Sequence, residues 1–248
     1  MKRFKDKVVV VTGAGSGIGK STAQRLDAEG ATLIIIDINK INLAKTKKLL
    51  KNTKSTSRIL DISNISDVEK MYQWLEKKYK KLDAVINVAG ILRFDNSHEI
   101  KTKDWNKILQ VNLTGTFFMC RYSLPLLLKT TGSIVNVSST AALGAHAWTA
   151  AYSASKGGIS AFSKTLANEY GPQGLNINCV CPASIETPMT DNANLPKDFD
   201  VRLLNKVLPV DGVNRSPDDI ASTIAFLASH DAIHINGIDL RVDGGLLT

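Results

Sequence analysis

The segment that decides the fold reads Thr12-Gly13-Ala14-Gly15-Ser16-Gly17-Ile18-Gly19, and it directly follows the apolar run Val8–Val11. A stretch with helical periodicity begins before this segment ends. A glycine-rich turn between a strand and a helix lets the backbone approach a pyrophosphate closely, and the helix N-terminus supplies free N–H groups and partial positive charge. The segment therefore predicts a strand, a phosphate-binding turn and a helix. An ordinary strand-to-helix turn is the alternative.

The same alternation of strand and helix patterns continues through the rest of the chain. Most strand candidates are continuous apolar runs, as expected where helices cover both faces of a sheet. They begin near residues 8, 32, 58, 84, 133, 176 and 238. The helices are expected over about residues 17–29, 39–53, 66–80, 102–128, 150–170 and 217–229. We therefore predict an α/β fold: one domain over residues 1–248, with a doubly wound, Rossmann-type parallel sheet of about seven strands and helices on both faces.

The third expected helix has a start signal of its own. It opens with Ser66-Asp67-Val68-Glu69, the pattern of a capping box in which the serine and glutamate side chains bond free backbone N–H groups. This pattern predicts a helix that begins at about Ser66.

One region, about residues 183–212, lacks clear periodicity. It contains Pro188, Pro196 and Pro209 together with several Asn and Asp residues. A long irregular segment inside a compact domain is usually a functional loop or lid. We expect this segment to be a substrate loop that covers a ligand.

Composition limits the class of protein. The chain has 248 residues, of which 44% are hydrophobic, enough to fill a large core. Its apolar runs are far shorter than the ~18 residues of a membrane span, and Met1–Lys7 has no secretion signal. Cys120, Cys179 and Cys181 are expected to be reduced core residues, and no metal-ligand spacing links them to the histidines. We expect a cytoplasmic protein without a membrane segment or a metal site.

The net charge of +8 is confined to one part of the chain. Between Lys40 and Lys81 there are 12 basic and 4 acidic residues, whereas the other segments contain 19 of each sign. This excess falls mainly on two expected helices, where lysines alternate with apolar residues. A solvated helix face explains the pattern better than a nucleic-acid surface, so no nucleic-acid partner is expected.

Asp37 ends the second expected strand, 18 residues after Gly19. An acidic residue near this position in the dinucleotide fingerprint binds a ribose 2′-hydroxyl. Two like unit charges ~4 Å apart at an effective dielectric of ~20 repel by about 4 kcal/mol, so a carboxylate here disfavours the extra phosphate of NADP. Lys40 could offset part of this repulsion. The sequence favours NAD.

Tyr152 and Lys156 stand four residues apart at the start of an expected helix, so both project from one face. A tyrosine with its ordinary pKa of ~10 is about 0.1% ionised at pH 7, so its use as a base requires stabilisation of tyrosinate by up to ~4 kcal/mol. A nearby ammonium contributes in that direction. A Tyr-x-x-x-Lys pair is also common on helix surfaces, and this reading stays open.

Taken together, the residues resemble the short-chain dehydrogenase/reductase family over essentially the whole chain. The joint order and spacing of the motifs, rather than any one of them, carry the resemblance. They are Thr12-Gly13-x-x-x-Gly17-x-Gly19, Asp61-Ile62, Asn87-Val88-Ala89-Gly90, Asn112, Ser138-Ser139, Tyr152-Ser153-Ala154-Ser155-Lys156, Pro182 to Met189 and Val242-Asp243-Gly244-Gly245.

The resemblance implies four candidate catalytic residues. Tyr152 would exchange a proton with the substrate oxygen, and Ser139, 13 residues earlier, would hydrogen-bond that oxygen, with Ser138 as the rival. Lys156 would hold the nicotinamide ribose and lower the pKa of Tyr152. Asn112 would anchor a water in a proton relay behind the lysine.

The resemblance also implies a set of coenzyme-binding residues. They are Gly13, Ser16, Gly17, Ile18, Gly19, Asp37, Asp61, Ile62, Asn87, Ala89, Gly90, Tyr152, Lys156, Pro182, Ile185 and Thr187. Two departures from the family pattern stand out. Val88 replaces a common Asn and should not disturb binding, whereas Ala183 replaces a common Gly. Because alanine disfavours positive φ, either the backbone at Ala183 is ordinary or the loop starts differently.

Substrate identity is beyond the sequence. His146 and Trp148 lie between the serine and the tyrosine, where the resemblance places the substrate wall. They could stack on a ring or flat apolar substrate, or they could simply pack the loop. Arg93 and Arg202 could bind a carboxylate, although surface positions explain them as well.

The leading hypothesis is an NAD-dependent oxidoreductase that interconverts a secondary alcohol and a ketone, with Tyr152 as acid/base. The alternative enzyme is a reductase of 3-oxoacyl thioesters on acyl carrier protein in fatty acid metabolism, a subgroup that usually prefers NADPH. A catalytically silent sensor or nucleic-acid scaffold is the alternative outside enzymes. The expected partner is a small alcohol or ketone, and the resemblance implies a homo-oligomer, a homotetramer or a dimer.

Overall fold

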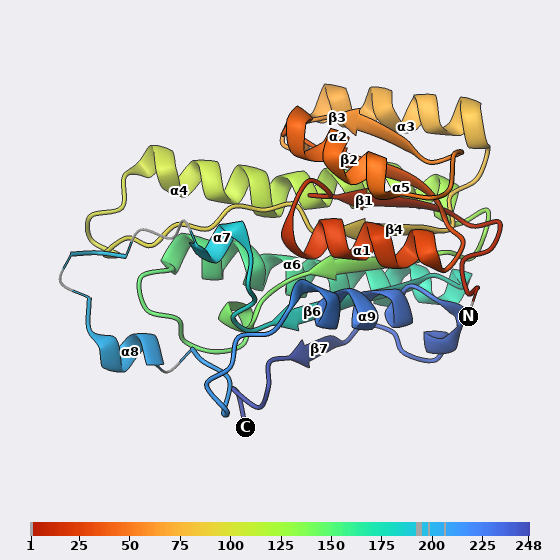
Figure 1. Cartoon of the computed structure of the whole chain (residues 1–248). Helices are drawn as coiled ribbons and strands as arrows, with labels where there is room; N and C mark the ends of the chain where they lie inside the picture. Colours follow the sequence, from red (N-terminus) through yellow and green to blue (C-terminus); the bar gives the residue numbers. More distant parts are fainter. Residues whose placement is uncertain (1, 192–194, 198, 206) are drawn as a thin grey trace.

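The computed structural model describes residues 2–191, 195–197, 199–205 and 207–248. Seven parallel strands form one sheet in the order β3-β2-β1-β4-β5-β6-β7 (Figure 1). The strands are β1 Val8–Thr12, β2 Thr32–Asp37, β3 Thr56–Ile59, β4 Ala84–Asn87, β5 Ser133–Val137, β6 Asn176–Pro182 and β7 Asp239–Val242. The predicted doubly wound parallel sheet of about seven strands is therefore confirmed.

Strand β1 lies at the point where the order of the sheet reverses. It pairs with β2 on one side, with Val8 opposite Thr32, and with β4 on the other, with Val9 opposite Ala84. The crevice outside the carboxyl ends of the strands at such a reversal is the usual ligand site of this architecture. The glycine segment that follows β1 opens onto this crevice.

Helices cover both faces of the sheet. They are α1 Gly17–Ala28, α2 Lys40–Leu49, α3 Ile65–Tyr79, α4 Thr102–Ile108, α5 Thr116–Leu127, α6 Ala150–Tyr170, α7 Pro188–Asp191, α8 Val201–Asn205 and α9 Pro217–Leu227. Apolar side chains of α1, α2 and α9 pack on one face, and those of α3, α5 and α6 pack on the other. Figure 1 shows α1 and α9 side by side, and α7 and α8 beyond the carboxyl edge of the sheet.

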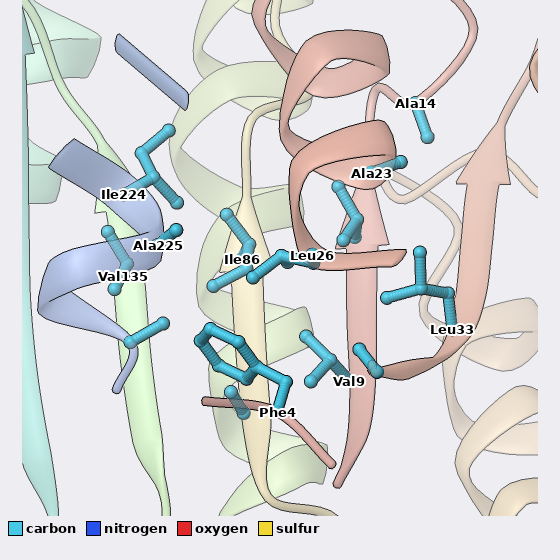
Figure 2. Close-up of a cluster of buried hydrophobic side chains, with 14 of the residues drawn as sticks. Phe4, Val9, Ala14, Ala23, Leu26, Leu33, Ile86, Val135, Ile224 and Ala225 are labelled. Carbon is cyan, nitrogen blue, oxygen red and sulfur yellow. The ribbon is translucent and has the colours of Figure 1, made fainter. Parts of the chain in front are cut away.

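The core explains why the central strands β1 and β2 are almost entirely apolar. Val9 and Val11 enter the cluster under α1 and α9, whereas Val8 and Val10 enter the cluster on the opposite face. Successive side chains of a strand point to opposite faces, so a strand covered on both sides buries both sets of side chains. Figure 2 shows Leu26 of α1 against the strand residues of the first cluster.

One local prediction about helices is wrong. The third helix begins at Ile65, and Asn64 caps it by accepting hydrogen bonds from the N–H groups of Ser66 and Asp67, so the predicted capping box does not form. The helix expected over residues 102–128 is present as continuous helical backbone from Thr102 to Leu127, and a π-helical turn that was not predicted, Leu109–Gly115 (η1), lies between α4 and α5. An Asn placed two residues before a serine competes with it as a cap, since both side chains accept backbone hydrogen bonds.

The basic region lies on α2, α3 and the segments around the edge strand β3. The Arg58 guanidinium stacks on the Trp74 ring at 3.5 Å from its centroid, and Lys81 pairs with Asp83 at 3.4 Å. No helix within the described ranges is long and apolar enough to cross a membrane.

Candidate active site

A cavity of about 450 Å³ lies at the carboxyl ends of the strands. The glycine segment forms part of its wall, as do Tyr152, Lys156 and residues of the 183–212 segment. Sixteen of the eighteen residues predicted for the site line it, namely Gly13, Ser16, Gly17, Ile18, Gly19, Asp37, Asp61, Ile62, Ala89, Gly90, Ser139, Tyr152, Lys156, Pro182, Ile185 and Thr187. The other two, Asn87 and Asn112, lie behind the wall.

The glycines of the first turn are required by close packing. Gly13 has a φ of +65°, and a Cβ atom there would lie 2.8 Å from the backbone nitrogen of Ala89. A Cβ atom on Gly19 would lie 2.1 Å from the carbonyl oxygen of Gly13. Any side chain at either position would push the turn away from the end of β4. Glycine thus brings the backbone of α1 and the end of β4 to the same wall of the cavity.

The N-terminus of α1 has no side-chain cap, a feature that it shares with α4, α5 and α6. Its cap residue, Ser16, makes no side-chain hydrogen bond to the first turn, and this turn holds no acidic residue. By contrast, Asn39, Asn64 and Ser216 cap α2, α3 and α9 with their side chains. Uncapped N–H groups at a helix N-terminus that faces a cavity fit an anion such as the pyrophosphate of a dinucleotide.

Asp37 lies beside this turn at the cavity wall. Its Oδ2 accepts a hydrogen bond from the N–H of Gly15 at 2.8 Å, and its Oδ1 accepts one from the N–H of Asn39 at 2.7 Å. A Cβ atom on Gly15 would lie 2.8 Å from Asp37 Oδ2, so glycine permits this approach. The carboxylate is therefore oriented by two backbone donors next to the phosphate-binding turn.

Asp61 and Ile62 lie further along the same wall. Burial raises the pKa of Asp61, but hydrogen bonds from Ser63 and the charge of Lys107 outweigh this effect and leave the pKa below its usual value. Ile62 is buried and lies against Gly115, where a Cβ atom would be 2.8 Å from Ile62 Cγ1. The pair thus supplies a charged and an apolar group to one end of the cavity.

Tyr152 sits in the first turn of α6. Burial raises the pKa of its phenol to about 12, and a hydrogen bond with the side chain of Ser139 acts in the opposite direction. The hydroxyl of Ser138 points elsewhere, because it donates to the carbonyl oxygen of Lys156 at 3.0 Å and lies 3.0 Å from the hydroxyl of Ser160. Of the two serines, only Ser139 is engaged with the tyrosine.

Lys156 follows one turn later on α6 and is 4% exposed. Its Nζ donates to the carbonyl oxygen of Val137 at 2.6 Å and lies 5.6 Å from the centroid of the Tyr152 ring. Burial lowers the pKa of this ammonium to about 8. The expected lowering of the tyrosine pKa by the lysine does not appear, because burial of the phenol dominates its pKa.

Asn112 lies in the π-helical turn and connects three elements. Its Oδ1 accepts from the N–H of Ile91 at 2.8 Å, and its Nδ2 donates to the carbonyl oxygen of Ile91 at 2.9 Å and to Ser155 Oγ at 3.0 Å. Between Asn112 and the lysine lies Gly90, where a Cβ atom would be 3.2 Å from Asn112 Oδ1 and 3.7 Å from Lys156 Nζ. Asn112 therefore lies behind Gly90 and the lysine, and its role in a proton relay stays a prediction.

Asn87 does not face the cavity. It is buried, and its Nδ2 donates to Asn136 Oδ1 at 2.8 Å on the face of the sheet that α5 and α6 cover. Its Oδ1 has no hydrogen-bond partner. Asn87 ends β4 directly before the lining residues Val88 and Ala89, and its side chain supports this strand end through Asn136.

The 183–212 segment crosses the cavity with little regular structure. It contains the short helices α7 and α8, and Ile185 pairs with Arg215 in an isolated parallel bridge. Residues 192–194, 198 and 206 of the expected loop lie outside the described part of the chain. Ala183 does not have a positive φ, so its backbone conformation is ordinary. Of the two alternatives that the sequence left open, an ordinary backbone or a loop that starts differently, the structure shows the first.

Two residues at the site were not assigned a role from the sequence. Thr12 Oγ1 accepts hydrogen bonds from the N–H groups of Val88 and Ala89, both at 3.1 Å, and so ties the glycine turn to β4. The position of Thr12 at the end of the first strand, directly before the glycine turn, is the sequence feature that could have indicated this role. Lys107 lines the cavity near Asp61. It resembles any exposed helix lysine in sequence, so no pattern marks it.

Known proteins similar to this chain carry the same fold and related activities. A family profile described as enoyl-(acyl carrier protein) reductase matches residues 13–247. Meso-2,3-butanediol dehydrogenase of Serratia marcescens is 36% identical over 243 residues, which cover 98% of this chain and 95% of that protein. The 3-oxoacyl-[acyl-carrier-protein] reductase of Thermotoga maritima is 35% identical over 248 residues, covering 99% of each chain.

A solved structure agrees with these sequence relatives. The crystal structure of levodione reductase superimposes with a TM-score of 0.87 at 28% identity, and the match covers 98% of each chain. The sequence profile, two enzymes above 30% identity and this structural match each extend over nearly the whole chain. The chain therefore belongs to the short-chain dehydrogenase/reductase family of oxidoreductases.

Proposed function

We propose that this oxidoreductase interconverts a secondary alcohol and a ketone with NAD as coenzyme and Tyr152 as acid/base. The observation that carries the proposal is the composition of one cavity wall. An uncapped helix N-terminus and a backbone-oriented Asp37 lie along it, and Tyr152 bonded to Ser139 lies with them in the same cavity. The dehydrogenase and reductases similar to the chain support the same reaction class.

The residues present fit a dinucleotide. The α1 N-terminus suits the pyrophosphate, and Asp37 suits the adenosine ribose hydroxyls, which can donate to its oxygens. Asp61 and Ile62 suit the adenine, and Lys156 suits the nicotinamide ribose. The remaining coenzyme-binding residues predicted from the sequence line the cavity, apart from Asn87. When bound, the nicotinamide supplies the hydride or accepts it.

Tyr152 handles the proton. With a pKa of about 12, its phenol is protonated near neutral pH and can donate a proton to the oxygen of a ketone. In the reverse direction the phenolate accepts the hydroxyl proton of the alcohol. Ser139 holds the phenol by its hydrogen bond and is placed to bond the same substrate oxygen. Lys156, one turn further along α6, would hold the nicotinamide ribose, and Asn112 fixes the backbone behind it.

The catalytic assignment is tested with Tyr152→Phe, which removes one hydroxyl and keeps the ring. The variant should lose at least about a hundredfold in kcat, the usual contribution of general acid/base catalysis, while NAD binding measured by fluorescence quenching stays close to wild type. A variant with near-normal kcat on the same substrate would show that another group moves the proton.

A 3-oxoacyl thioester reductase of the acyl carrier protein type is the second candidate. The 35% identity to the Thermotoga maritima enzyme favours it. The carboxylate of Asp37 at the ribose position weighs against it, because that subgroup is expected to prefer NADPH. Comparing kcat/KM for NAD and NADP at one fixed salt concentration separates the two candidates. The cytoplasmic location, the homo-oligomer and the role of residues 183–212 as a substrate lid stay predictions.

A further inference from the structure

The charged side chains of the cavity wall bear on what kind of substrate the cavity can hold. Among the described residues, four charged side chains line the cavity: Asp37, Asp61, Lys107 and Lys156. Asp37 is bonded to the glycine turn, and Lys107 acts on Asp61. Lys156 donates to the carbonyl oxygen of Val137. Asp37, Asp61 and Lys156 are held by hydrogen bonds, whereas Lys107 makes none within the described part of the chain and lies near Asp61, at the end of the cavity assigned to adenine.

The two arginines near the cavity are turned away from it. Arg93 bonds Asp95 at 2.7 Å, and Arg202 bonds Asp200 at 2.7 Å with its side chain 89% exposed. Neither lines the cavity, although Leu92, Phe94 and Leu203 beside them do. The suggestion from the sequence that these arginines bind a carboxylate is therefore not supported by their positions.

His146 lines the cavity and does not supply a positive charge either. Burial lowers the pKa of its imidazole, so the ring is neutral near pH 7. A carboxylate that entered this part of the cavity would lose its hydration without gaining a cation, which is costly.

The wall near Trp148 is largely apolar and partly aromatic, with the hydroxyl groups of Thr149, Ser184 and Thr190 among its apolar side chains. Phe94, Trp148, Met189, Leu203, Leu204 and Val207 line it. Trp148 is held from two sides, because its carbonyl oxygen accepts from the N–H of Asp95 at 2.9 Å and its ring meets the edge of Phe199 at 6.3 Å between centroids. Its φ of +62° is an unfavourable conformation for a tryptophan. Strain of this kind at a cavity points to a constraint on where the ring must lie.

We infer that the substrate is an uncharged secondary alcohol or ketone built on an apolar ring, held against Trp148 and the apolar side chains of the 183–212 segment. This inference rests on the proposed alcohol/ketone reaction at Tyr152 and adds the class of substrate. The flat indole face and the surrounding apolar side chains favour a rigid apolar ring.

Two matched pairs of substrates test the two parts of the inference. Methyl 3-hydroxybutanoate and 3-hydroxybutanoate differ in charge, and 4-methylcyclohexanol and 2-heptanol differ in the ring. With NAD, the ester should exceed the acid by at least about a hundredfold in kcat/KM because an unpaired carboxylate resists burial. The cyclic alcohol should exceed the acyclic one by about tenfold.

Variants of Trp148 connect the ring preference to this wall. Trp148→Ala should lower kcat/KM for the cyclic alcohol by at least about tenfold and change that for the acyclic one by less than about threefold. Trp148→Phe should restore most of the loss. Trp74→Ala is the matched control, since Trp74 lies on α3, stacks under Arg58 of β3 and does not line the cavity. It should leave the ratio of the two alcohols unchanged.

Failure of this inference differs from failure of the proposed function. Three results would overturn the inference while the alcohol/ketone reaction stands. The acid could be turned over at or above the rate of the ester, or only acyclic alcohols could be turned over. The ratio of kcat/KM for the cyclic and the acyclic alcohol could also stay unchanged in Trp148→Ala. Absence of turnover for every member of both pairs and their ketones, with NAD and with NADP, would overturn both.

Discussion

The buried ammonium of Lys156 should destabilise the folded protein, and replacing it by an isosteric apolar side chain should reveal the cost. Lys156 is 4% exposed, and burial lowers its pKa from 10.5 to about 8. At ~1.4 kcal/mol for each pH unit, this difference corresponds to about 3 kcal/mol at pH 7, where both folded and unfolded chains hold the proton. Lys156→Met removes this cost.

The variant also loses the hydrogen bond to the carbonyl oxygen of Val137, which offsets part of the gain by ~1–3 kcal/mol. That loss does not depend on pH, whereas the cost of the charge does. Between about pH 8 and 10.5 the unfolded chain keeps the proton and the folded protein does not, so wild-type stability rises with pH through this window. The stability advantage of Lys156→Met over wild type should therefore fall by about 2 kcal/mol between pH 7 and pH 10.

Urea unfolding of both proteins at pH 7, 8, 9 and 10 measures this difference. Lys164→Met is the matched control on the same helix, because Lys164 is largely solvent-exposed and its bond with Asp239 raises its pKa. Its difference from wild type should stay level from about pH 7 to 9. A level difference for Lys156→Met over the whole range would refute the reasoning, since it would mean that Lys156 titrates as it does in the unfolded chain.

Three further outcomes are expected. Asp37→Ala removes the carboxylate that disfavours the phosphate of NADP by about 4 kcal/mol. The value of kcat/KM should therefore fall for NAD and rise for NADP until the two are nearly equal. An unchanged preference for NAD would show that another residue determines coenzyme selectivity. Because burial raises the pKa of Tyr152 to about 12, alcohol oxidation should increase steadily from pH 7 to 10 while ketone reduction stays level, and a falling oxidation profile would contradict the role of the phenolate. Protease cleavage within residues 183–212 should slow when NAD and a substrate analogue are added, whereas equal rates would argue against a lid.

Much of the fold could be predicted because the sequence repeats one simple pattern. Continuous apolar runs such as β1 and β2 can be buried on both faces only in a sheet covered by helices, and the glycine turn fixes the direction of the first crossover. The expected helix over residues 150–170 matches α6 at both ends. These features depend on short-range patterns that tertiary contacts reinforce.

The environment of the site residues could not be predicted in the same way. The spacing of Tyr152 and Lys156 places them on one face of α6, but their pKa values follow from burial, which depends on β5, β6 and the 183–212 segment around them. The resemblance already favoured Ser139 over Ser138, and the structure adds the physical difference between them, because the Ser138 hydroxyl donates to the carbonyl oxygen of Lys156 while Ser139 bonds Tyr152.

The π-helical turn at Leu109–Gly115 shows why one feature had no signal in the sequence. Gly115 is the residue of this stretch that most disfavours a helix interior, and a single glycine does not distinguish a π-helical turn from a regular helix. Single π turns commonly occur at functional sites because the wider turn redirects a side chain. Here it lets Asn112 bond both backbone groups of Ile91 and the hydroxyl of Ser155 at once. Since Ile91 follows β4 and Ser155 precedes Lys156, the turn joins the end of β4 to the start of α6, and both of these elements contribute to the cavity wall.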